Sequence, residues 1–143
     1  MPPPAPDAES DCIFCRIVAR KAPAYTIYED ASTMAFLDLF PFTRGHSLVI
    51  SKRHAPRLTD LRFDDQAALI RTLDEICRRA ERLTSDYNVA LNAGARAGQI
   101  VFHVHFHVIP RYGESNPFHP PTRSRIPEAD AETLVGELSV ASS

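Results

Sequence analysis

The sequence lacks a large excess of charge of either sign. Its 16 Lys and Arg residues stand against 18 Asp and Glu residues, which gives a formal net charge of −2. Without a broad electropositive surface, polymeric nucleic acid is not an expected partner. No apolar run approaches the roughly 20 residues of a membrane-spanning helix, and Met1 to Asp11 has no basic start followed by a hydrophobic centre. We therefore expect no membrane partner and a cytoplasmic protein.

Cysteine is scarce, and its three positions, Cys12, Cys15 and Cys77, are an odd number. This fits a metal site or free thiols better than a disulfide framework and indicates a reducing compartment. The close pair has the C-x-x-C spacing of a metal site, although two thiolates leave a zinc ion only half coordinated. The alternative is two buried thiols that pack like small hydrophobic side chains.

The chain has no internal repeat, and its 143 residues, 44% of them hydrophobic, suit a single domain. Residues 1–10 contain four prolines, which block regular hydrogen bonding, so we expect a flexible N-terminal tail there. We expect the domain over residues 11–112. A partly irregular C-terminal extension over 113–143 would follow, with a weak helix at 128–138.

Strand and helix signals alternate along the domain. The spacing of apolar residues predicts an amphipathic helix over 64–83, and Asp11 could cap a short helix before it. Runs rich in strand-forming residues occur at 25–29, 33–38, 47–51, 87–91 and 101–109. The strands cluster without regular helical crossovers, which favours a largely antiparallel α+β fold.

Three of the six histidines alternate within 101–109, at His103, His105 and His107. Alternate side chains of a strand share a face, so the three imidazoles should project together. The outer Cα atoms would lie about 13 Å apart, whereas zinc holds each nitrogen at about 2.1 Å, so at most two are ligands of one ion. An imidazole left over can attack a phosphate or acyl group. We expect an enzyme's active centre here, chance histidines on a solvent-facing strand being the weaker interpretation.

This segment resembles the His-φ-His-φ-His-φ-φ pattern, with φ hydrophobic, of the histidine triad family of nucleotide hydrolases and transferases. The resemblance covers residues 11–112, where further segments follow the family order: Cys12 to Cys15, Ala35 to Asp38, Gly45 to Ile50, Asn92 and Ala97 to Gln99. It implies a five-stranded antiparallel sheet with two helices, doubled in a homodimer into a ten-stranded sheet. The helix over 64–83 would form much of that interface.

The resemblance also implies a chemistry. His105 would attack the α-phosphorus of a purine nucleotide and form a nucleotidyl-histidine intermediate that water resolves. His107 would bind the α-phosphate, Gln99 would position the phosphate or the leaving group, and Asn92 lies where the family contacts phosphate. Asp38 matches the family's ribose-binding carboxylate. The base pocket would be lined by Ile13, Phe14, Ile17, Phe36, Leu37 and Leu39, although such apolar residues equally fit a plain core.

Some zinc-binding, bacterial-type members complete a tetrahedral site with the histidine at the position of His54 and the first triad histidine, here His103. With Cys12 and Cys15 this implies a structural Zn²⁺, because four protein ligands leave no open position for water. The sequence assigns no functional role to three residues: Cys77, His119 and His46, the last expected at most as a buried hydrogen-bonding side chain.

Position 100 departs from the family, because many members place a Ser or Thr there that is thought to hydrogen-bond the leaving group. Ile100 cannot do so. The substrate stays open between a purine nucleoside phosphoramidate and a dinucleoside polyphosphate. Two other classes stay open as well: a nucleotide-binding regulatory protein with little turnover, which would tolerate His105→Ala, and a zinc-held structural module without nucleotide affinity.

Overall fold

The computed structural model describes residues 11–114 and 123–142 of the chain. Three helices and five strands follow one another, with the 3₁₀ turns η1 (Leu58–Asp60) and η2 (Ala95–Ala97) between them. In chain order the elements are α1 (Ile13–Val18), β1 (Thr26–Glu29), β2 (Thr33–Leu37), β3 (Ser47–Ser51), α2 (Phe63–Ala80), β4 (Tyr87–Leu91), β5 (His105–Pro110) and α3 (Glu128–Leu138).

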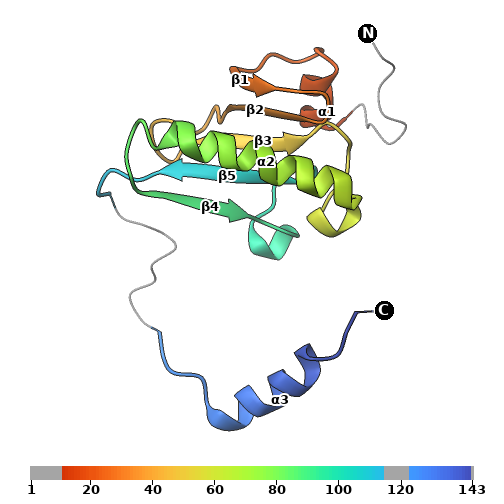
Figure 1. The fold of residues 1–143 in the computed structure, drawn as a ribbon, viewed down its shortest axis with the longest axis vertical. Coiled ribbons are helices and arrows are strands. Elements are labelled where there is room, and N and C mark those ends of the chain that lie inside the picture. The colour runs from red at the N-terminus through yellow and green to blue at the C-terminus, as the bar shows by residue number, and fades with distance from the viewer. Residues whose placement is uncertain (1–10, 115–122, 143) are drawn as a thin grey trace.

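The five strands form one antiparallel sheet in the order β1-β2-β3-β5-β4, which confirms the expected fold class (Figure 1). β5 therefore lies inside the sheet, between β3 and β4. β1 and β4 are the two edges. The two helices that the resemblance implies are α1 and α2, and α3 is a third helix where the weak signal over 128–138 predicted one.

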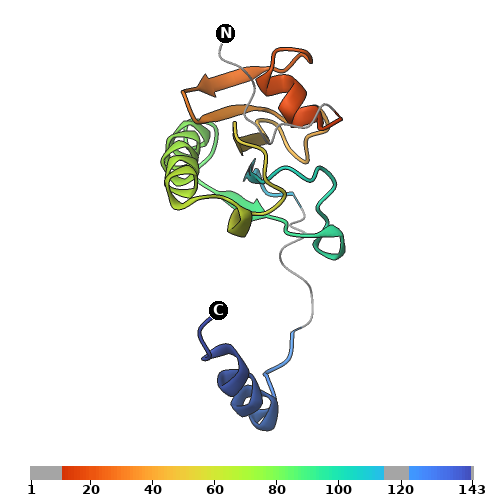
Figure 2. The ribbon, with the colours of Figure 1, turned by 90° about the vertical axis from the view of Figure 1, so that its right-hand side faces the viewer.

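The sheet carries its apolar side chains on both faces, because α1 and α2 lie on opposite sides of it (Figure 2). Strand alternation sorts the residues: Ala35 packs in the cluster that includes residues of α2, whereas its neighbours Met34 and Phe36 pack with Phe14 of α1. The histidines at 105 and 107 alternate with Val108, which belongs to the α2 cluster. Their imidazoles thus emerge on the α1 face.

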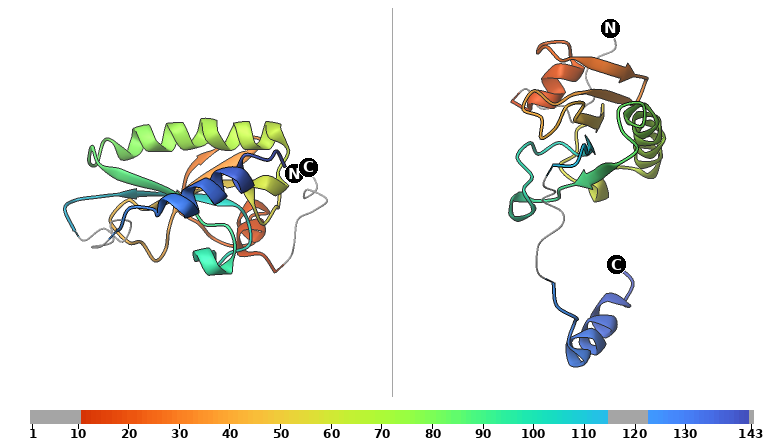
Figure 3. Two further views of the ribbon diagram at one scale, coloured as in Figure 1. Left: turned by 90° about the horizontal axis from the view of Figure 1, so that it is seen from below. Right: turned by 90° about the vertical axis from the view of Figure 1, so that its left-hand side faces the viewer.

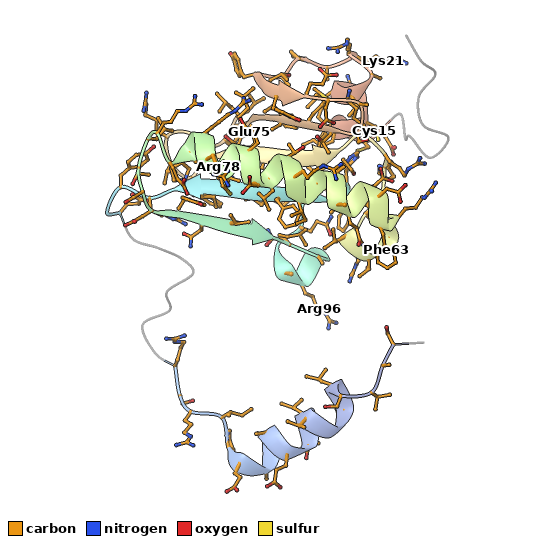
Figure 4. The ribbon with its side chains drawn as sticks, in the orientation of Figure 1. Cys15, Lys21, Phe63, Glu75, Arg78 and Arg96 are labelled. Atoms are coloured by element: carbon orange, nitrogen blue, oxygen red, sulfur yellow. The ribbon has the colours of Figure 1, made fainter. Side chains whose placement is uncertain are left out.

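α2 is amphipathic, as its apolar spacing predicts. Leu69 and Ile76 are buried against the sheet, whereas Arg78 lies on the outer side and pairs with Asp74 one turn earlier (Figure 4). Two predictions for this helix were wrong: it ends at Ala80 rather than 83, and Ile70 is 53% exposed in the single chain.

Two local expectations also differ from the structure. The N-cap of α1 is Cys12, whose sulfur accepts the Cys15 N–H, so Asp11 does not cap it. The last strand begins at His105 rather than 101, because residues 101–103 form a bend.

The described C-terminal helix α3 adds little to the body. The predicted N-terminal tail and His119 fall outside the described residues. α3 has no buried residue among its eleven and lies apart from the sheet (Figure 3). None of the described helices combines the length and apolar composition that crossing a membrane requires.

Candidate active site

His105 and His107 occupy neighbouring positions on the pocket side of β5. The register places His105 opposite Ile50 and His107 opposite Leu48 of β3, so the surrounding strands hold both rings rigidly. The two ring centroids lie 4.9 Å apart. His105 is only 7% exposed. The strand therefore presents two adjacent imidazoles at the floor of a pocket, as the spacing predicted.

His105 is held in one tautomer by the chain just before it. Its Nδ1 lies 2.7 Å from the carbonyl oxygen of His103, and a carbonyl can only accept, so Nδ1 carries the proton. In the neutral ring, Nε2 then keeps its lone pair. Because His105 lines the pocket, the unprotonated nitrogen is available to an electrophile that binds there.

His46 fixes the tautomer of His107, a role that sequence reasoning missed. The backbone N–H of Phe42 donates to Nδ1 of His46, so Nε2 of His46 carries the proton and donates to Nδ1 of His107 at 2.9 Å. The remaining nitrogen of His107, Nε2, is then a donor. The only signal in the sequence was the Gly45-His46 segment of the family pattern, which says nothing about a partner 61 residues away.

Burial keeps these imidazoles uncharged. Desolvation lowers the pKa of His105 and of His46, and it lowers the pKa of His107 to about 4, with repulsion from the neighbouring histidines adding to the effect. At neutral pH the site thus offers one free lone pair on His105 and one N–H donor on His107, without a net positive charge.

A pocket of about 380 Å³ opens beside the two imidazoles. The Phe14 and His105 rings pack edge to face with their centroids 5.0 Å apart, which joins the apolar part of the pocket to the floor. Every residue predicted for the base and ribose lines it: Ile13, Phe14, Ile17, Phe36, Leu37, Asp38 and Leu39. These side chains border an open pocket as well as packing together, and their contact with a nucleotide base stays a prediction.

Asp38 follows β2 at the rim of the same pocket. Its Oδ1 accepts the N–H of Phe40, and its Oδ2 lies 3.6 Å from Nε2 of His46. The carboxylate is about one-fifth exposed, so oxygen lone pairs remain open to a ligand. This position suits recognition of adjacent hydroxyl groups.

Gln99 and Asn92 are not among the residues that line the pocket. The Gln99 amide is buried and engaged on both sides: Oε1 accepts the Gly94 N–H at 2.8 Å, and Nε2 donates to the carbonyls of Pro56 and Val101. In this structure it fixes the loop that leads to β5. Contacts of Gln99 and Asn92 with phosphate stay predictions. The neighbouring Ile100 does line the pocket.

The four predicted metal ligands, Cys12, Cys15, His54 and His103, converge on one point, with ligand atoms all within 4.8 Å of one another. His103 Nδ1 lies 3.5 Å from each sulfur and 3.3 Å from Nδ1 of His54, and Cys15 Sγ lies 3.2 Å from that nitrogen. Ligands of a tetrahedral zinc with Zn–N about 2.1 Å and Zn–S about 2.3 Å lie about 3.3 to 3.8 Å apart. The cluster could hold such an ion.

The protonation of His103 fits the same use. Its Nε2 lies 2.7 Å from the carbonyl oxygen of Ser51 and must donate, so Nδ1 faces the two sulfurs with a lone pair. The bend at 101–103 turns this ring away from the pocket. Three histidines that looked alike in the sequence thus divide into one that faces the cysteines and two that face the pocket.

Comparison with protein families matches residues 19–114 to the HIT domain. An uncharacterised HIT-like protein of Mycobacterium tuberculosis is 48% identical over 101 residues, which cover 69% of this chain and 70% of that protein. The adenylylsulfatase HINT3 of Arabidopsis thaliana is 37% identical (72% of this chain, 53% of that protein). The adenosine 5'-monophosphoramidase hnt1 of Schizosaccharomyces pombe is 39% identical (72% and 76%).

Solved structures agree with these matches. The crystal structure of a HIT family member from Bacillus subtilis superimposes with a TM-score of 0.83 at 32% identity, covering 94% of this chain and all of the other.

Proposed function

The chain belongs to the HIT domain family, and from this membership we propose that it is a nucleotide hydrolase or transferase acting at the α-phosphate of a purine nucleotide. The proposed substrates are a nucleoside phosphoramidate or a dinucleoside polyphosphate. The observation that carries the proposal is His105, whose Nδ1 is held by the carbonyl of His103 while its ring lines the pocket. Two relatives named as hydrolases of adenosine compounds support the same class.

The proposed reaction has two steps. Nε2 of His105 attacks the α-phosphorus, and the bond from phosphorus to the leaving group breaks with its electron pair on the leaving atom. Water then attacks the nucleotidyl-histidine, which releases the nucleoside monophosphate and restores the imidazole. Splitting the displacement in this way needs a nucleophile that is neutral before each turnover, and the burial that lowers the pKa of His105 supports that state.

The other residues would bind and orient. Nε2–H of His107 would donate to a non-bridging oxygen of the α-phosphate, with His46 holding the His107 ring. Asp38 would accept from the ribose hydroxyls, and the apolar pocket walls on α1 and β2 would hold the base. His46 thus acts through His107 as a positioning residue.

The test is turnover of an adenosine phosphoramidate and of diadenosine polyphosphates by wild type and His105→Ala. We expect kcat to fall about a thousandfold or more in the variant. An intermediate trapped by acid quench should carry AMP on the peptide containing His105. A regulatory nucleotide-binding protein would instead bind AMP with no turnover that depends on His105, and a structural module would bind no nucleotide.

We also propose a structural Zn²⁺ held by Cys12, Cys15, His54 and His103. Bound there, the ion would join α1 to the segments that carry the two histidines and so brace one wall of the pocket. With four protein ligands it would take no part in the chemical step. Hydrogen-bonded thiols are the alternative.

Assembly and location complete the proposal. We propose a homodimer, supported by the open edge of β4, where Val89 is 43% exposed, and by the exposed Ile70 on α2. Residues 11–112 would be the catalytic domain and 113–143 an extension. Cys12, Cys15 and Cys77 form no disulfide with one another, which supports the cytoplasm as the compartment of this protein.

A further inference from the structure

In-line displacement fixes the side of the pocket on which the leaving group lies. A leaving group departs from phosphorus on the side opposite the attacking atom. His105 is the attacking residue of the proposed function and is 7% exposed at the pocket floor. The leaving group therefore points from the phosphate toward the pocket mouth.

Two of the most exposed apolar side chains in the described part of the chain border that mouth. Ile100 is 87% exposed and Phe40 is 89% exposed, yet both line the same pocket as His105. Each would lose water contact if an apolar group in the pocket lay against it, and that burial favours binding. Neither side chain helps to build the core, so the fold itself does not explain them.

In the described part of the chain, the pocket lining has no cationic side chain that could stabilise a highly charged leaving group. Among the described residues that line the pocket, Asp38 is the only charged side chain, and none is a Lys or Arg. Arg96, on η2 just before this segment, projects away from the sheet (Figure 4). A departing polyphosphate or sulfate would bring several negative charges to a pocket whose lining, in the described part of the chain, carries a carboxylate and no Lys or Arg.

We propose that Ile100 and Phe40 form an apolar leaving-group subsite, so that the preferred substrate carries an apolar group on the α-phosphorus of a nucleoside monophosphate. This rests on the proposed function and chooses among its substrates. An apolar amine would leave with the P–N electron pair and one proton from water at the exposed mouth. An apolar acyl group would leave with the P–O pair as a carboxylate and need no proton, which suits a site where Ile100 provides no hydroxyl donor.

The test compares two adenosine phosphoramidates whose amines have similar basicity, phenethylamine and ethanolamine, in wild type, Ile100→Ser and Ile100→Ala. Wild type should cleave the phenethylamine compound with a kcat/KM about tenfold or more higher. Both variants should bring this ratio close to one. Phe102→Ser is the matched control, because Phe102 is half exposed on the same segment but does not line the pocket, and it should keep the ratio.

Two further substrates complete the series: the adenylate of phenylacetic acid, and diadenosine tetraphosphate. Preference for the adenylate over the phenethylamine compound identifies the acyl source, and the reverse identifies the amine. Three results would overturn the subsite: equal rates for the two amine compounds in wild type, a ratio unchanged by Ile100→Ser, or preference for the tetraphosphate. In each case the proposed function would stand as long as turnover depended on His105. If none of these compounds were turned over, both the subsite and the proposed function would be wrong.

Discussion

At the scale of single residues, the site is a set of imidazoles whose partners decide what each can do. Carbonyl oxygens force the proton of His105 onto Nδ1 and that of His103 onto Nε2. The backbone N–H of Phe42 donates to Nδ1 of His46, so the proton of His46 lies on Nε2. One side-chain type thereby provides an unprotonated Nε2 on His105, an unprotonated Nδ1 on His103 and an N–H donor on His107, without any change in covalent chemistry.

Removing His46 should impair catalysis through His107. In His46→Ala, Nδ1 of His107 loses its donor, and the ring can adopt the tautomer that presents no N–H to the phosphate. We expect kcat to fall by about tenfold or more. His46→Gln, which can donate from its amide, should recover part of the rate. Steady-state kinetics beside a melting curve separates this from unfolding, and equal rates for wild type and Ala would contradict it.

The pH dependence of folding stability should follow the protonation of His107. Its pKa of about 4 in the folded chain lies below the ordinary histidine value of about 6.5, so below that value the unfolded chain binds a proton that the folded chain refuses. Stability is fully present above about pH 6.5 and declines as the pH falls toward 4. The slope of melting temperature against pH in this window should be smaller in His107→Asn. An unchanged slope would show that other groups control it.

At the scale of elements, α2 contributes stability through one face only. Ile76 is 2% exposed against the sheet, whereas Ile70, nearly two turns earlier, is 53% exposed. Ile76→Ala should lower the free energy of unfolding by about 2 to 5 kcal/mol, because it leaves a cavity. Ile70→Ala, the same change on the open face, should cost about 0.5 kcal/mol or less in the monomer. Urea denaturation of both changes in a monomeric background such as Val89→Lys measures the difference, and equal losses there would mean that the single chain itself buries Ile70.

α1 is too short to be stable alone, and the proposed zinc would tie it down. Purified protein should contain about one zinc ion per chain, and EDTA should lower its melting temperature. Cys15→Ser should lose the zinc and melt at the lower temperature without added chelator. Cys77→Ser, which changes a cysteine outside the cluster, should keep the metal. Metal-free wild type that melts at the same temperature with and without EDTA would favour the thiol alternative.

At the scale of the whole molecule, the sheet has two different edges. β1 and β4 are both open to pairing in the single chain, but of the two only β4 carries an exposed large apolar side chain, Val89. Charged residues on an edge strand prevent pairing with another sheet. Val89→Lys should therefore give a monomer by light scattering, whereas Thr26→Lys on β1 should leave the dimer intact. The opposite pattern would place the interface on β1.

The sequence by itself determined much of the local structure. Strands β3 and β4 have the bounds that their composition predicted, and the alternation through His105 and His107 placed both rings on one face. Local periodicity is sufficient for such statements because it depends only on backbone geometry. It was insufficient at the start of β5 and at the cap of α1, where a bend and a cysteine sulfur replaced the expected strand and Asp11.

Only the tertiary structure decided which distant residues meet. The antiparallel pairing of β3 with β5 brings His46 to His107, and the bend before β5 turns His103 away from its two neighbours toward Cys12 and Cys15. The same packing exposes Ile100 at the pocket mouth and buries the adjacent Gln99. Contacts of this kind depend on sheet register and on which groups satisfy buried hydrogen bonds, and neither is encoded in the spacing of residues along the chain.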